Sequence, residues 1–181
     1  MSGAVGYDAA HPEGLMPDET DFDSRRFRDV LGHFATGVTV VTVNNDGDVR
    51  GMTANAISSL SLEPPLLLVC VQKDASIYEH FDRAKAFAMN VLSADQEDIS
   101  NLFASHGGPD QPLGGLPYHE GPLGSPILDG VLASADCRIT QRIDGGDHTI
   151  VIGEAVSVSL DGSDADPLLF YRGGYRRLAA D

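Results

Sequence analysis

Polar side chains that could bind a phosphate gather around one apolar run of the sequence. Ser58, Ser59 and Ser61 alternate with apolar residues ahead of two prolines, so their hydroxyls meet where a phosphate could be received. Lys73 follows the next apolar run and could add a charge-assisted contact, roughly twice as strong as a neutral hydrogen bond. The alternative for Lys73 is a solvated lysine at the end of a strand.

His148 is the second candidate for chemistry, and it stands between a turn and a strand. The four residues before it, 144–147, are aspartate and glycine, and the run after it is rich in β-branched residues. The ring therefore lies at a strand entrance, where it can face a cavity. A lone histidine near a turn is more often a plain surface residue, and its spacing alone does not separate the two interpretations.

Charge and composition limit what these residues can serve. The chain has 181 residues, 42% of them hydrophobic, and a net charge of −15, which predicts one globular domain and excludes nucleic-acid binding. Only two lysines occur, Lys73 and Lys85, so a phosphate must rely on them, on arginines, or on hydroxyls and backbone amides. No apolar run approaches the ~18 residues that a bilayer span needs, which predicts no membrane contact.

The ends and the cysteines predict the compartment. Residues 1–21 mix glycine, proline and acidic residues without periodicity, which predicts a disordered or loosely attached arm before one domain over 22–181. The start lacks the basic and apolar regions of a secretory signal, so we expect a cytoplasmic protein. Cys70 and Cys137 each lie in an apolar, strand-like run, and we interpret both as reduced core residues.

Helical periodicity is confined to a few short segments. The spacing over 24–35 predicts an amphipathic helix capped by Asp23 or Ser24, with Gly37 in the left-handed position after it. Ser76 is a candidate cap for a short helix over 77–81. Ser93 or Asp95 can cap a later helix whose Ile99, Leu102 and Phe103 share one face.

The rest of the chain is dominated by strand patterns joined by turns. Predicted strands cover 38–43, a run from Val49, 66–71, 86–92, 131–143, 148–160 and a final strand or hairpin in 168–178. Residues 106–130 hold seven glycines and five prolines, which suits a lid, a binding loop or a dimer contact. Long strands joined mainly by hairpins, with few inserted helices, predict a mainly β fold: a closed or split antiparallel barrel.

The Gly-rich signatures of dinucleotide-binding and P-loop folds are absent, so phosphates are held in another way. Five other stretches follow one another along the chain: FRDVLGHFATGVTVVT (27–42), RGMTANAISSLSLEPPLLLVCV (50–71), FAMNVLS (87–93), GDHTIVIGE (146–154) and LLFYRGGYRRL (168–178). In this order they resemble the flavin reductase-like family of FMN-binding split barrels. The resemblance covers about residues 24–178.

The resemblance implies where a flavin binds. It places the ring and ribityl chain along Met52, Thr53, Ala54, Asn55 and Ala56, where amides and short polar side chains can meet the carbonyl and imide edge of an isoalloxazine. Without the resemblance, Thr53 and Asn55 are more typical of a polar strand face. It further assigns the flavin phosphate to Ser58, Ser59, Lys73 and Ser76. It places Asn90, Ser93 and Phe103 at the phosphate or adenosine end of the flavin.

The resemblance also implies a site for a pyridine nucleotide. It places His148 beside the nicotinamide, with Tyr171, Tyr175 and Arg176 as nucleotide contacts; closing the barrel or the dimer is the alternative for these three. NADH is favoured over NADPH, because the candidates offer little positive charge for a 2′-phosphate. FAD and FMN remain equally open as the acceptor, and no metal is expected.

Taken together, the resemblance implies a homodimeric reductase that moves a hydride from NADH to FAD or FMN. The reduced flavin would then serve a partner flavin-dependent monooxygenase. Two alternatives remain at this point: an oxidase acting directly on a small substrate, as the pyridoxamine phosphate oxidases do, and a non-enzymatic flavin-binding or redox module. A lysine-poor chain disfavours the oxidase, which would want a basic pocket for an anionic substrate.

Overall fold

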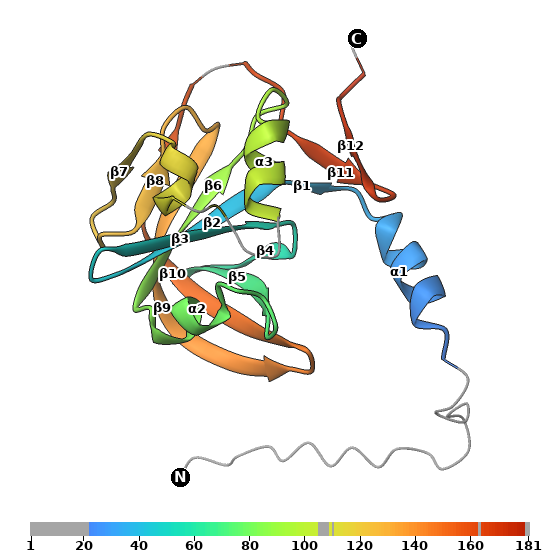
Figure 1. Cartoon of the computed structure of the whole chain (residues 1–181), viewed down its shortest axis with the longest axis horizontal. Helices are drawn as coiled ribbons and strands as arrows, with labels where there is room; N and C mark the ends of the chain where they lie inside the picture. Colours follow the sequence, from blue (N-terminus) through green and yellow to red (C-terminus); the bar gives the residue numbers. More distant parts are fainter. Residues whose placement is uncertain (1–21, 105–108, 110, 163, 180–181) are drawn as a thin grey trace.

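Antiparallel β-strands make up most of the molecule (Figure 1). The computed structural model describes residues 22–104, 109, 111–162 and 164–179. The arm predicted over 1–21 lies outside these residues. The mainly β prediction is confirmed, and none of the helices within the described ranges has the length and apolar character needed to cross a bilayer.

One sheet of seven strands forms the barrel, and every pairing in it is antiparallel. Its order, from one edge to the other, is β3 (Asp48–Ala54), β2 (Thr39–Asn45), β6 (Ala86–Val91), β9 (Ala133–Gly145), β10 (His148–Leu160), β5 (Pro65–Gln72) and β4 (Ile57–Leu62). Between them, the hairpins β2–β3, β4–β5 and β9–β10 supply six of the seven strands.

The barrel is split between β3 and β4. These strands are the two opposite edges of the sheet, yet only Asn55 and Ala56 separate them in the chain. The strand predicted to run on from Val49 is therefore two strands, β3 and β4. The two residues between them link the two edges of the sheet across the split. The Cys70 N–H donates to the Ala56 carbonyl at 3.0 Å, which holds this crossing against β5.

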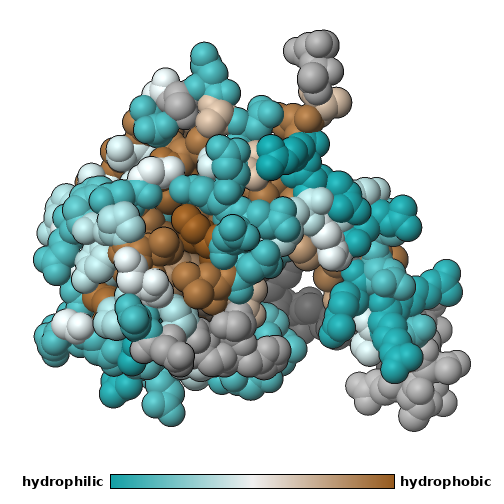
Figure 2. Space-filling model, turned by 45° about the horizontal axis from the view of Figure 1, so that its top comes forward, coloured by the Kyte–Doolittle hydropathy of each residue, from teal (hydrophilic) through white to brown (hydrophobic). Residues whose placement is uncertain are grey.

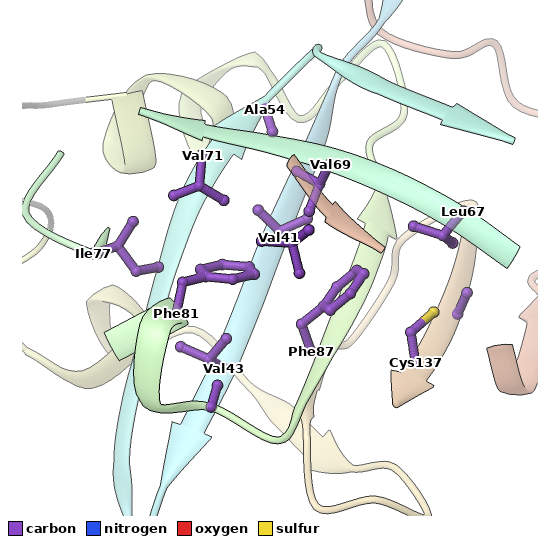
Figure 3. Close-up of a cluster of buried hydrophobic side chains, with 13 residues drawn as sticks. Val41, Val43, Ala54, Leu67, Val69, Val71, Ile77, Phe81, Phe87 and Cys137 are labelled. Carbon is purple, nitrogen blue, oxygen red and sulfur yellow. The ribbon is translucent and has the colours of Figure 1, made fainter. Parts of the chain in front are cut away.

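The barrel interior is a cluster of apolar side chains from strands that face one another (Figure 3). Phe81 and Phe87 lie with ring centroids 5.8 Å apart, among Val41, Val43 and Val71. Cys137 belongs to this core, as predicted, and burial, followed by the nearby charge of Asp136, raises the pKa of its thiol to about 12. Cys70 is only half-buried, because alternation on β5 turns it away from Val69 and Val71.

A second apolar cluster lies on the outer face of β2 and accounts for the Gly/Pro-rich segment. Its described residues form a 3₁₀ turn, η1 (Pro112–Gly115), and the hairpin of β7 (Tyr118–Glu120) with β8 (Pro126–Leu128). Leu113 and Leu128 insert from this segment against Val38 and Val40. The predicted 38–43 run is therefore buried on both faces, which explains why it lacks polar alternation.

The first helix, α1 (Ser24–Gly32), projects from the barrel (Figure 1). Asp23 caps it as predicted, accepting hydrogen bonds from the N–H groups of Arg25 and Arg26 at 2.9 and 3.2 Å. The predicted left-handed role of Gly37 is wrong, because the helix ends at Gly32 and Gly37 instead lies in β1 (Thr36–Gly37). None of the α1 residues is buried.

Three further elements border the split and the tail. α2 (Tyr78–Arg83) follows β5. The prediction that Ser76 caps this helix is wrong, because Ile77 occupies the N-cap position without a side-chain hydrogen bond. α3 (Glu97–Ala104) lies over β3, with Phe103 buried beneath it. The tail forms the predicted hairpin, β11 (Leu169–Tyr171) and β12 (Gly174–Arg176), and β11 pairs with β1 in a separate sheet.

Candidate functional site

A cavity of about 280 Å³ opens where the barrel is split. Its wall comes from the end of β3, the crossing to β4, the end of β5, the loop before α2, the end of α3 and the start of β10. The lining residues are Gly51, Met52, Thr53, Ala54, Asn55, Ala56, Cys70, Gln72, Asp74, Ala75, Ser76, Ile77, Phe103, Ala104 and His148.

The β3 wall of the cavity is thin because of one glycine. A Cβ at Gly51 would lie 2.9 Å from Cε1 of Phe103, so the absence of a side chain lets the ring of α3 pack directly on the strand. Thr53 is fixed to the same helix, since its hydroxyl donates to the Ser100 carbonyl at 2.6 Å. β3 is also an edge strand, so alternate amide and carbonyl groups on its outer side have no ladder partner within the sheet.

His148 forms the opposite wall of the cavity, at the first position of β10. It stands across from Gly145 on β9 and Gln72 on β5, which places it at the mouth of the barrel, as its position after a turn predicted. Its Nδ1 lies 2.7 Å from Oδ1 of Asp147. The hydrogen bond from His148, and then its charge, lowers the pKa of the Asp147 carboxyl, so this group is ionised at neutral pH.

Lys73 is held by the turn that precedes His148. Its Nζ donates to Oδ1 of Asp144 at 2.5 Å and to the Gly146 carbonyl at 2.6 Å, while its backbone N–H donates to the Asp147 carbonyl. The hydrogen bond with Asp144 raises the pKa of Lys73 and lowers that of Asp144. The ammonium therefore fixes the turn beside the cavity rather than lining the cavity itself.

The structure brings one group of the predicted residues together. Although they come from four segments of the sequence, all of them line the same cavity: Met52, Thr53, Ala54, Asn55, Ala56, Ser76, Phe103 and His148. Ser58 and Ser59 lie just beyond it, exposed on β4, with the Ser58 hydroxyl donating to the Ser59 carbonyl.

Two predicted residues lie in the body of the fold instead. Asn90 is fully buried on β6, where its amide donates to the Val40 carbonyl at 3.0 Å and accepts from the Leu128 N–H at 2.9 Å. Ser93 is buried after the same strand and forms a single bridge with Pro167. The Asn90 side chain thus ties the barrel to β8, whereas Ser93 holds the segment before the tail through its backbone.

None of the predicted tail residues lines the cavity, and Tyr175 instead contacts α3. The Tyr175 hydroxyl lies 2.8 Å from Ser100 Oγ and donates to Asn101 Oδ1 at 3.0 Å. Tyr171 packs edge-on against His33, with ring centroids 5.9 Å apart. Arg176 is exposed and donates to its neighbour's carbonyl. Tyr175 is thus linked through Ser100 to Thr53 on the cavity wall.

Several residues that line the cavity were not predicted from the sequence, although strand alternation could have identified two of them. Cys70 and Gln72 share one face of β5, two residues apart, so alternation could have paired them. Asp74 and Ala75 lie in the turn after that strand, with the Ala75 N–H bonded to the Gln72 carbonyl. Nothing in the local pattern says that this turn meets β3.

The family follows from a comparison with protein-family models. The flavin reductase like domain model matches residues 31–179, which include both walls of the cavity and the tail hairpin. The chain belongs to this family. The antiparallel split barrel predicted from the resemblance is thereby confirmed as well, since solved flavin reductases share the fold.

Two relatives within the flavin reductase family are similar over most of their length. The reductase subunit HsaB of a flavin-dependent monooxygenase from Rhodococcus jostii is 43% identical over 181 residues, which are 100% of this chain and 88% of that protein. The FMN reductase (NADH) SmoA of Agrobacterium fabrum is 40% identical over 169 residues, covering 91% of this chain and 94% of the relative.

A solved structure of the same family agrees with the fold. The Streptomyces globisporus NADH:FAD oxidoreductase SgcE6, in complex with NAD and FAD fragments, has a TM-score of 0.81 and 38% sequence identity. The similarity covers 93% of this chain and 99% of that one.

Proposed function

We propose that this chain is an NADH-dependent flavin reductase that supplies reduced FAD or FMN to a partner flavin-dependent monooxygenase. The observation that carries the proposal is the cavity at the split, because two of the five stretches that make the sequence resemble the family, 50–71 and 146–154, contribute to its walls. The names of the relatives support the reaction: one is an FMN reductase (NADH), and another is the reductase subunit of a monooxygenase. They give no support to the oxidase or the carrier alternative.

The residues of the cavity fit a flavin ring. Gly51, Ala54 and Ala56 are small, so a flat ring can approach the backbone of the β3 edge and its crossing closely. Open amides and carbonyls on this edge match the alternating acceptors and donor of an isoalloxazine. At about 280 Å³ the cavity suits the ring system, and the phosphate end would extend over the exposed serines of β4.

The residues predicted to bind the flavin phosphate differ in how many contacts their side chains already make. Asp144 and the Gly146 carbonyl take two of the three donors of the Lys73 ammonium, so this side chain has one donor left for a phosphate. Ser58, Ser59 and Ser76 are exposed and can turn toward a phosphate without breaking the core. We therefore assign the flavin phosphate to the hydroxyls first and to Lys73 second.

When bound, the flavin supplies the hydride acceptor, so the protein needs no nucleophile or general acid. The task of the chain is to hold the nicotinamide against one face of the ring, with donor and acceptor atoms roughly 3–3.5 Å apart. His148 stands on the wall opposite β3, where it can orient the nicotinamide. No lysine or arginine is among the described residues that line this cavity, which favours NADH over NADPH.

A homodimer is part of the proposal. The apolar face of α1 is uncovered, with Phe27, Val30 and Leu31 at least half exposed, and Leu62 on β4 is 89% exposed. Figure 2 displays apolar residues gathered in the middle of one face of the barrel, and hydrophilic residues on the visible side of the projecting helix. A helix of nine residues is marginal by itself, so we infer that a second copy covers it.

Two features favour a cytoplasmic location. The cosubstrate NADH belongs to the interior of cells, and both cysteines are free thiols, which suits a reducing compartment.

Steady-state oxidation of NADH with FAD, FMN and riboflavin in turn tests the proposed reaction. We expect turnover with FAD or FMN, and a lower KM for NADH than for NADPH. Binding of flavin without turnover would contradict the enzyme assignment, and the absence of flavin binding would remove the proposal altogether.

A further inference from the structure

The carboxylate next to His148 is placed to control the histidine ring. Asp147 Oδ1 lies 2.7 Å from Nδ1 of His148, and His148 lines the cavity, whereas Asp147 does not. In a neutral imidazole one ring nitrogen donates and the other accepts. An ionised partner at Nδ1 requires the proton there, so Nε2 is left as the acceptor for a ligand.

The backbone that carries Asp147 is itself fixed. Lys73 donates from its backbone to the Asp147 carbonyl at 2.9 Å and from its side chain to Gly146 and Asp144 in the same turn. A carboxylate on a free loop could not hold a ring in one orientation. Here three hydrogen bonds from a single lysine hold the turn against the end of β5.

We propose that Asp147 is a positioning residue, which holds His148 with its Nε2 free to accept a hydrogen bond from the nicotinamide carboxamide. The inference rests on the proposed function, because it takes NADH as the ligand. It assigns to Asp147 an effect on nucleotide binding that acts through the histidine.

The charge of Asp147 by itself predicts the opposite effect on NADH binding, so the two explanations can be distinguished. The chain carries a net charge of −15, and NADH is an anion, so the Asp147 carboxylate should repel its pyrophosphate. Removal of that charge alone would tighten NADH binding. Removal of the hydrogen bond would weaken it, since the ring could then turn or change its tautomer.

The pair contributes little to folding, so stability does not confuse the test. The side chains of His148 and Asp147 are 36% and 85% exposed, and exposed pairs of this kind stabilise a fold only weakly. A matched control exists in the same chain. His119 and Asp129 form an exposed pair at 2.9 Å, and neither residue lines this cavity.

Two substitutions in the full chain separate position from charge. Asp147→Ala should raise the KM for NADH about fivefold, with the KM for flavin and the Tm unchanged. Asp147→Asn keeps an oxygen that accepts from Nδ1–H, and it should restore the KM for NADH to within about twofold of wild type. Asp129→Ala should change none of these quantities.

Steady-state kinetics and Tm measurements decide the outcome for NADH. An unchanged or lower KM for NADH in Asp147→Ala would overturn the inference in favour of charge alone. A rise in the KM for flavin instead of NADH would also overturn it, because His148 would then face the flavin.

A measurement without turnover keeps this inference separate from the proposed reaction. Nitrogen-15 NMR of the histidine rings, at a pH where they are neutral, reports the tautomer of His148 directly. We expect the Nδ1–H form to dominate in the wild type and in Asp147→Asn, and to fall in Asp147→Ala. An unchanged tautomer would refute the positioning role, while failure of the wild type to oxidise NADH would refute only the proposed function.

Discussion

The two edge strands of the barrel, β3 and β4, differ in what covers them. They are separated by two residues in the chain and lie at opposite edges of one sheet. On β3, the chain's own α3 packs against Gly51 and bonds to Thr53, and the end of the strand lines the cavity. On β4, the side chains of Leu60 and Leu62 remain 48% and 89% exposed.

This difference separates two uses of an open edge. An edge whose face is covered by its own chain stays rigid, and its free amides and carbonyls can bind a small ligand. An edge with large apolar side chains in solvent suits a protein surface. We therefore propose that the flavin ring lies on β3 and that a second copy of the chain packs on β4. Two experiments test that division, and two more test the His148 wall and the turn beside it.

The largest effect should come from a charge on the β4 edge. Leu62→Glu should raise the dissociation constant of the dimer about 100-fold, because a two-fold interface contains the substitution twice. Analytical ultracentrifugation over a dilution series measures it. Leu178→Glu, at another exposed leucine in the tail, is the control. A dimer as strong as the wild type would show that β4 is not the contact.

A side chain at the thin point of β3 should act on the ligand instead. Gly51→Val would collide with the ring of Phe103, since a Cβ alone lies 2.9 Å from it. Overpacking of this kind costs about 1–3 kcal/mol, so the Kd for flavin, measured by fluorescence quenching, should rise about tenfold.

Gly37→Ala is the matched control for the β3 experiment. A Cβ at Gly37 has no neighbour within 4 Å, and its backbone needs no positive φ. We expect this variant to bind flavin normally. If Gly51→Val also bound flavin normally, the ring could not lie against this part of β3.

The wall opposite β3 should affect the nucleotide more than the flavin. His148→Ala should raise the KM for NADH about fivefold and leave that for flavin within about twofold, because we propose that the ring orients the nicotinamide. Initial rates with each substrate varied in turn give both constants. His119→Ala, in the equivalent exposed pair, is the control. Equal effects on the KM for NADH and the KM for flavin would show that His148 does not lie beside the nicotinamide.

The smallest effect concerns the Lys73–Asp144 pair at the cavity mouth. The pKa of Asp144 is lowered by its hydrogen bond with Lys73, so that contribution is present above the unfolded pKa near 3.8 and is lost as pH falls through the folded value. The pKa of Lys73 is raised, so its contribution is lost only as pH rises through a value above 10.5.

Between these limits the Lys73–Asp144 pair should add a small, constant stabilisation. Lys73→Gln should therefore lower the Tm slightly at pH 7, and the difference should disappear near pH 2 and shrink in high salt. Thermal unfolding by circular dichroism measures it, with Lys85→Gln as control. A difference that persists at pH 2 would mean that the bond from Nζ to the Gly146 carbonyl or the methylene stem of Lys73, rather than the pairing with Asp144, holds the turn.

The sequence determined the local elements of this protein, because their signals come from neighbouring residues. Asp23 caps its helix, and the 38–43 run forms a strand. About half of the residues that line the cavity were also predicted, but they came from the family resemblance rather than from local signals.

Only the tertiary structure decided how those elements meet. The break at Asn55 and Ala56 carries no strong turn signal, yet it sends β3 and β4 to opposite edges and creates the cavity. Lys73 finds Asp144 across 71 residues of sequence, and Gly51 takes its meaning from a ring on α3. Such contacts depend on how the sheet closes, and sheet closure is a property of all seven strands together.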